Sequence, residues 1–174
     1  GFWQFMKKTA PEYGLEVTST VDERYHVEKS THAACQYLKE SYEKFGNCAL
    51  AAASYNMGMT GVEQRLEAQG VDSYWELHLN SETGRYVYRI LAVKEVLSKP
   101  ETYGFQLTEK DLYHPHEVRK IAITASVEDL SDFALNNGSN YRELKELNPW
   151  LIKESFVVTP GKIYTVLFPK TVTE

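Results

Sequence analysis

The sequence predicts a mainly α-helical domain over residues 1–99 and a small α+β module over residues 117–170, joined by a connector at 100–116. Apolar residues recur at helical spacing through the first 99 residues, and no period is visible in the connector. After residue 117 apolar residues first alternate, as in a strand, and then return to helical spacing. A chain of 174 residues can accommodate one ordinary domain and a small module.

Two helices are predicted in the first half of the helical domain. Ser30 can act as an N-cap for a helix over 30–45, which Gly46 would end. Asn47 can cap the next helix, which covers 48–57 and is rich in alanine. Small side chains let neighbouring helices approach closely, so we expect the second helix to pack in a core.

Two further helices complete the first domain. Thr60 and Glu63 match a capping box, which predicts a short helix that ends near Gly70. A longer helix is predicted over 81–97. Its apolar residues fall on one face: Tyr86, Ile90, Val93 and Leu97.

The module has the predicted order strand, helix, helix, strand. Alternation predicts a strand over 117–125, and helical spacing predicts helices over 127–137 and 141–147. A second strand is predicted over 162–168, before Pro169.

Composition excludes several classes of protein. Hydrophobic residues make up 43% of the chain and aromatic residues 13%, which is typical of a globular protein. The net charge of -5, without a basic block, argues against nucleic acid as a partner. No apolar run reaches the roughly 18 residues that a membrane-spanning helix needs.

Neither a disulfide nor a metal site is predicted. Cys35 and Cys48 lie near the starts of successive helices, too far apart for a bridge, so we expect two free, buried thiols. The close pair His114 and His116 lacks further ligands at suitable spacing, and solvated histidines are the expected outcome. No motif for a nucleotide or another cofactor is present.

Five short strings in the first domain carry a family resemblance. They are GFWQFM at 1–6, VDER at 21–24, STHAACQYL at 30–38, AAASYNMG at 51–58 and SETGRYVYRILA at 81–92. In this order they resemble the lytic transglycosylases of bacterial cell walls, most closely those of the membrane-bound murein transglycosylase D type. The resemblance implies a lysozyme-like SLT fold for the first domain. The strand–helix–helix–strand module is similar to LysM, a small peptidoglycan-binding fold.

The resemblance implies a set of substrate-binding residues: Gln4, Met6, Tyr55, Asn56, Glu82 and Tyr86. An amide suits sugar recognition because it both donates and accepts hydrogen bonds. Glu82 and Tyr86 are four residues apart and therefore share a helical face. The alternatives are structural: a buried Tyr55, an Asn56 that ends its helix, and a Glu82 placed by the helix dipole.

The resemblance also implies that the catalytic residue is missing. The family's glutamate lies upstream of the glycine that corresponds to Gly1, so we expect no catalytic residue and no metal or other cofactor in this chain. Asp22, Glu23 and Arg24 are assigned a structural role, as a loop tied by charged hydrogen bonds, and Glu23 is not expected to replace the acid.

Three hypotheses for function follow. The chain is an N-terminally incomplete transglycosylase that cleaves the MurNAc–GlcNAc β-1,4 bond, a non-catalytic peptidoglycan-binding protein, or a structural interaction domain. The first two have peptidoglycan strands as partner and imply the periplasm of the cell envelope, with a membrane anchor in a missing N-terminal segment. A bare apolar face in the first domain would favour a homo-oligomer that covers it.

Overall fold

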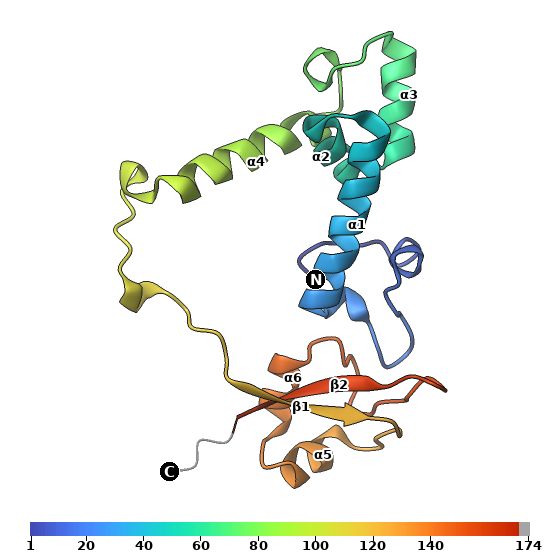
Figure 1. Ribbon diagram of the computed structural model, residues 1–174, viewed down its shortest axis with the longest axis vertical. Coiled ribbons are helices and arrows are strands. Elements are labelled where there is room, and N and C mark those ends of the chain that lie inside the picture. The colour runs from blue at the N-terminus through green and yellow to red at the C-terminus, as the bar shows by residue number, and fades with distance from the viewer. Residues whose placement is uncertain (171–174) are drawn as a thin grey trace. The chain divides into compact units, whose positions relative to one another are not determined.

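The computed structural model describes residues 1–170, which contain six α-helices and a two-stranded antiparallel sheet (Figure 1). The elements are α1 (Val27–Phe45), α2 (Cys48–Met57), α3 (Met59–Gln69), α4 (Thr83–Ser98), β1 (Val118–Ile123), α5 (Leu130–Asn136), α6 (Tyr141–Leu147) and β2 (Tyr164–Pro169). The predicted fold class, mainly α followed by a small α+β module, is confirmed.

Contacts divide the chain into two compact units that do not follow chain order. Residues 1–34 and 114–170 belong to the first unit, and residues 35–113 form the second. Helix α1 begins in the first unit and ends in the second. The sequence-based bounds 1–99 and 117–170 describe changes in residue spacing and stay a prediction, whereas the contacts join the first 34 residues to the module.

The second unit packs around α2. The Asn47 side chain caps this helix by accepting hydrogen bonds from the amides of Ala49 and Leu50, and the helix bounds agree with the predicted 48–57. Its buried face meets α3 and α4, and the core consists of Leu50, Ala53, Val62, Tyr74 and Val87. The alanines of α2 therefore permit the close helix packing expected from the sequence.

The outer face of α4 is apolar and exposed. Ile90, Val93 and Leu97 are 44%, 57% and 74% exposed, and together with Tyr86 they line one shallow groove. The prediction that these residues share a face is confirmed. Val87, one residue from Tyr86, points instead into the core and is 5% exposed.

Three local predictions for the helices are wrong. Helix α1 begins at Val27, and Ser30 lies inside it with its hydroxyl donating to the Val27 carbonyl. Helix α3 begins after Gly58, without a capping box. Both cysteines are free, as predicted, but exposed, because Ala33 and Ala34 occupy the inward positions beside Cys35, and Cys48 opens α2.

The first unit contains the predicted strand–helix–helix–strand module. Strands β1 and β2 pair antiparallel from Val118–Pro169 to Ile123–Tyr164, and α6 packs against β2. Helix α5 starts at Leu130, later than predicted, because Asp129 caps it and Val127 pairs with Phe156 in an isolated bridge. Most of the core belongs to the module: Ile123, Leu130, Ala134, Leu144, Trp150, Leu151, Phe156, Tyr164, Val166 and Phe168.

One residue of that core comes from the other end of the chain. Val21 is fully buried in the module core and pairs with Leu151 in an antiparallel bridge. The amide of Asp22 donates to the Trp150 carbonyl at 2.9 Å, and the amide of Ile152 donates to the Thr20 carbonyl at 3.1 Å. The segment around Val21 is therefore a structural part of the module.

Candidate functional site

The first group of expected site residues lies in the N-terminal motif, residues 1–6. Gln4 is exposed, has the unusual positive φ of 51°, and donates from its side-chain nitrogen to the Gly1 carbonyl at 2.5 Å. Met6 is 72% exposed. Between them Phe5 is buried, and the Trp3 indole donates to the Thr31 hydroxyl at 2.8 Å. The motif is thus anchored by its aromatic residues and presents Gln4 and Met6 to solvent.

The VDER loop, residues 21–24, contacts this motif through Arg24. The Arg24 guanidinium forms two short bonds with Asp22, Nε to Oδ1 at 2.9 Å and a terminal nitrogen to Oδ2 at 2.6 Å. Its other terminal nitrogen donates to the Phe5 carbonyl at 3.1 Å. A Cβ on Gly1 would lie 1.9 Å from the Arg24 carbonyl oxygen, so only glycine fits there. The structural role predicted for VDER is confirmed.

Glu23 is bound on both sides of its carboxylate. It is 3% exposed, one oxygen accepts from the Glu16 amide at 2.8 Å, and the other forms an ion pair with Lys29. Both oxygens of the Glu23 carboxylate therefore form charge-assisted contacts that hold the loop.

The second group of expected site residues meets between α2 and α4. The side-chain oxygen Oδ1 of Asn56 accepts from the Thr83 hydroxyl at 2.7 Å, and its side-chain nitrogen Nδ2 donates to the Glu82 carboxylate at 3.3 Å. The side chain of Asn80 accepts hydrogen bonds from the amides of Glu82 and Thr83 at the start of α4. Glu82 stands at the N-cap position without a capping bond, which leaves its exposed carboxylate directed to Asn56.

Two tyrosines beside this group remain protonated at neutral pH. Burial, and next the neighbouring Tyr86 and Tyr37, raise the pKa of Tyr55 to about 12. Burial also raises the pKa of Tyr86 above its ordinary value. The ring of Tyr55 packs edge-on against Tyr37, with 5.2 Å between centroids. Both phenols are therefore hydrogen-bond donors as well as acceptors, as sugar hydroxyls and acetamido groups require.

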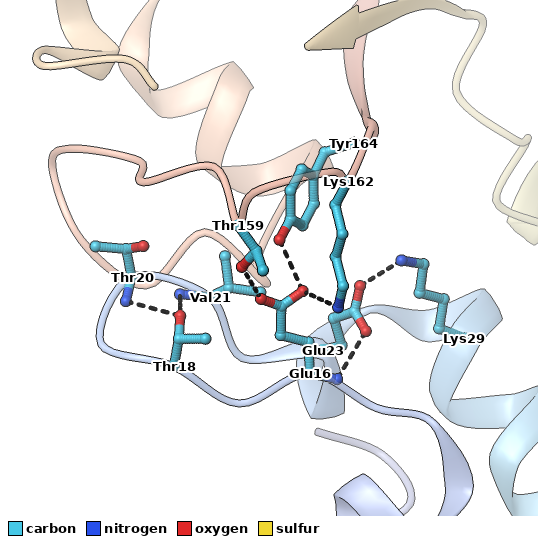
Figure 2. Close-up of polar contacts among 9 residues, drawn as sticks. All are labelled: Glu16, Thr18, Thr20, Val21, Glu23, Lys29, Thr159, Lys162 and Tyr164. Atoms are coloured by element: carbon cyan, nitrogen blue, oxygen red, sulfur yellow. Dashed lines mark hydrogen bonds and ion pairs between the residues drawn. The ribbon is translucent and has the colours of Figure 1, made fainter. Parts of the chain in front are cut away.

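Sequence reasoning missed a polar cluster around Glu16 (Figure 2). One oxygen of its carboxylate accepts from the Thr159 hydroxyl at 2.5 Å, and the other accepts from Lys162 at 2.9 Å and the Tyr164 hydroxyl at 2.7 Å. Burial opposes ionisation, but these bonds outweigh it and hold the pKa of Glu16 below its ordinary value. The partners lie 143 to 148 residues away in sequence, so no local pattern could have indicated them.

The structure brings Tyr55, Asn56, Glu82 and Tyr86 together in the second unit, while Gln4 and Met6 lie in the first. Their role in substrate binding stays a prediction. Within residues 1–170, no group of three or more His, Cys, Asp or Glu side chains is placed to hold a metal ion. No helix in the same range has the length and apolarity that a membrane crossing requires.

Comparison with known proteins matches both parts of the chain to families. The Transglycosylase SLT domain matches residues 1–78, and the Soluble lytic transglycosylase C-terminal LysM-like domain matches residues 119–172. The chain thus carries an SLT domain followed by a LysM-like domain. The resemblance predicted from the five strings is thereby confirmed.

Two curated proteins similar to this chain are both described as Membrane-bound lytic murein transglycosylase D. They come from Escherichia coli K12 and from Escherichia coli O6:H1. Each is 30% identical over 175 residues, an alignment that includes 98% of this chain. The chain spans 38% of the length of these relatives.

Proposed function

We propose that this chain supplies the glycan-binding part of a peptidoglycan lytic transglycosylase. The reaction cleaves the β-1,4 bond between N-acetylmuramic acid and N-acetylglucosamine and leaves a 1,6-anhydro product. The observation that carries the proposal is that Tyr55 and Asn56, within the SLT match at 1–78, meet Glu82 and Tyr86, which follow it in the chain. Neutral phenols, an amide and an exposed carboxylate are the groups that recognise sugar hydroxyls and acetamido groups.

The chemistry needs one acid. A protonated carboxyl donates to the leaving glycosidic oxygen, and the resulting carboxylate then accepts the proton of the muramoyl 6-hydroxyl as that oxygen attacks the anomeric carbon. Neither water nor a cofactor enters the balance. In this scheme Tyr55, Tyr86 and Asn56 of the second unit hold and orient sugar rings. In the first unit, the Gln4 amide binds an acetamido or hydroxyl group and Met6 offers an apolar contact.

We propose that none of Glu16, Glu23 and Glu82 is the proton donor. Both oxygens of Glu16 and both oxygens of Glu23 already accept hydrogen bonds or ion pairs, which argues against either buried carboxyl as the acid. Glu82 is exposed and lacks the apolar surroundings that keep a catalytic carboxyl protonated. The chain alone should therefore bind peptidoglycan with negligible turnover, since a general acid contributes roughly two to four orders of magnitude in rate.

The site of action follows from the substrate. Peptidoglycan strands are the partner, and the relatives are named as membrane-bound murein enzymes, so we place this protein in the bacterial cell envelope, on the periplasmic side. The exposed apolar face of α4 also supports a homo-oligomer in which Ile90, Val93 and Leu97 are covered. A concentration series by analytical ultracentrifugation tests that part, and a monomer at high concentration would contradict it.

Digestion and co-sedimentation with purified sacculi test the function. We expect co-sedimentation of the chain without anhydro-muropeptides by mass spectrometry. Tyr86→Phe and Asn56→Ala should weaken the binding, whereas Tyr113→Phe, a matched change on a fully exposed connector tyrosine, should not. Anhydro products would show that a carboxyl of this chain is the donor.

The remaining outcomes separate the other hypotheses. Binding that survives both variants would favour a glycan-binding protein that uses its LysM-like module. Absence of binding would favour an interaction domain and contradict the proposal.

A further inference from the structure

We propose that the LysM-like module positions the glycan-binding motif at the start of the chain through the Glu16 cluster, defined as Glu16, Thr159, Lys162 and Tyr164. The module would then contribute to glycan binding by residues 1–6, and the residues of the cluster are positioning residues for Gln4. The expected effect on glycan binding rests on the proposed function. The structural coupling from Glu16 to residues 1–10 does not.

The first step is the connection between the module and Glu16. Three side chains from the loop before β2 and from its first residue converge on one carboxylate, as Figure 2 shows. The Glu16 side chain is 8% exposed. Hydrogen bonds to a buried charged group are among the strongest in proteins, so this contact fixes the position of Glu16 relative to the module.

The second step leads from Glu16 to the VDER loop. The Glu16 amide donates to the Glu23 carboxylate and the Glu23 amide donates to the Glu16 carbonyl, each at 2.8 Å. Between them the chain turns back on itself, with Val17 bridged to Asp22 and the Thr18 hydroxyl accepting from the Val21 amide. A displacement of Glu16 would therefore move Glu23 and the residues beside it.

Stacked aromatic rings form a further contact between the VDER loop and the module. The rings of His26 and Trp150 are stacked with 5.9 Å between centroids, and Trp150 is stacked on Tyr164 at the same distance. Tyr164 is also the residue whose hydroxyl donates to Glu16. These ring contacts provide a second connection between His26, which follows the VDER loop, and Tyr164 of β2.

The third step leads from the VDER loop to Gln4. The Arg24 guanidinium, held by Asp22, donates to the Phe5 carbonyl, and the Arg24 carbonyl lies against Gly1. Gln4 lies between these two contacts with its left-handed backbone, a conformation that a non-glycine residue adopts only when its surroundings impose it. The position of the Gln4 amide thus depends on the VDER loop, and the loop depends on the module.

Hydrogen exchange of the full chain, combined with sacculus co-sedimentation, tests the proposal. Thr159→Val removes the hydroxyl at constant shape, and Thr159→Ser retains it. Glu16→Gln removes the charge. Glu117→Gln is the matched control, because this carboxylate of the same unit is 79% exposed and pairs with Lys170.

We expect Thr159→Val and Glu16→Gln to speed exchange of the Glu23, Thr9 and Ala10 amides by about tenfold, while the β1 and β2 amides keep their protection. Affinity for sacculi should fall several-fold in the same variants. Thr159→Ser and Glu117→Gln should leave both measurements unchanged. This rescue by serine distinguishes positioning from a general loss of packing.

Two results would overturn the proposal. One is unchanged exchange at Thr9 and Ala10 in Glu16→Gln. The other is faster exchange of the whole unit, β1 and β2 included. If the unmodified chain does not bind sacculi, the proposed function fails, but the exchange measurement still decides whether the module positions the motif.

Discussion

The molecule contains two polar clusters that differ in how fully their atoms are used. In the Glu16 cluster a nearly buried carboxylate accepts from three side chains and has little capacity left for a ligand. Between α2 and α4, Asn56 and Glu82 share a single long bond of 3.3 Å, and Glu82 is exposed. The first cluster therefore maintains structure, whereas the second has atoms available for a substrate.

The largest expected effect on the free energy of unfolding comes from a cavity in the core of the first unit. Leu151→Ala removes a fully buried side chain that pairs with Val21, and the free energy of unfolding should fall by about 2–5 kcal/mol. Leu135→Ala on α5 is the control, because Leu135 is 65% exposed, and its effect should stay within about 0.5 kcal/mol. Denaturant unfolding measures both. Equal effects would contradict the core assignment.

Removal of the charge at the first cluster should have a smaller effect that depends on pH. The folded-state pKa of Glu16 is below its ordinary 4.5, so its stabilisation is present above that value and is lost as the pH falls through the folded pKa. Glu16→Gln should therefore cost about 1.5–3 kcal/mol at neutral pH and progressively less in acid. Unfolding curves at several pH values between about 7 and 3 measure this. A pH-independent cost would contradict the account.

His26 contributes a second dependence on pH in the same region. Burial, and next Lys29, lower the pKa of His26 below its ordinary 6.5. A base with a depressed folded-state pKa stabilises the fold above the unfolded-state value and destabilises it as the pH falls below that value. His26→Gln should flatten the stability profile between about pH 7 and pH 5. An unchanged slope in that range would contradict the neutral state of the half-buried His26.

The smallest effect on stability is expected at the second cluster. Tyr86→Phe and Glu82→Gln change exposed or half-buried atoms, and the free energy of unfolding should change by less than about 1 kcal/mol. The same variants should weaken co-sedimentation with sacculi. A large loss of stability without a loss of binding would reverse the roles of the two clusters.

Local chemistry explains which parts of the fold the sequence could predict. Asn47 with a run of alanines predicted the bounds of α2, and the five strings predicted the SLT domain. The cap at Ser30 was wrong because serine can also donate to a carbonyl one turn earlier within a helix. The prediction that the cysteines are buried was wrong. Residue type alone does not show which face of a helix meets the core, and Ala33 and Ala34 occupy the inward positions beside Cys35.

The part of the site that could not be predicted is long-range. Tyr55, Asn56, Glu82 and Tyr86 were expected from the family resemblance, and their contacts are consistent with a common position. Glu16 carries no motif, and its partners come from the opposite end of the chain. No local pattern distinguishes Glu16 from a solvent-exposed glutamate. Its carboxylate is nearly buried because the fold brings three donors to it.

The central claim, that residues 1–34 and the module form one structural unit, is tested most directly by cutting the exposed connector. A protease site inserted after Gln106 would divide the chain into two fragments joined by no peptide bond. We predict that the fragments co-elute in size-exclusion chromatography under native conditions and separate in denaturant. Separate elution of a folded C-terminal module under native conditions would contradict the account.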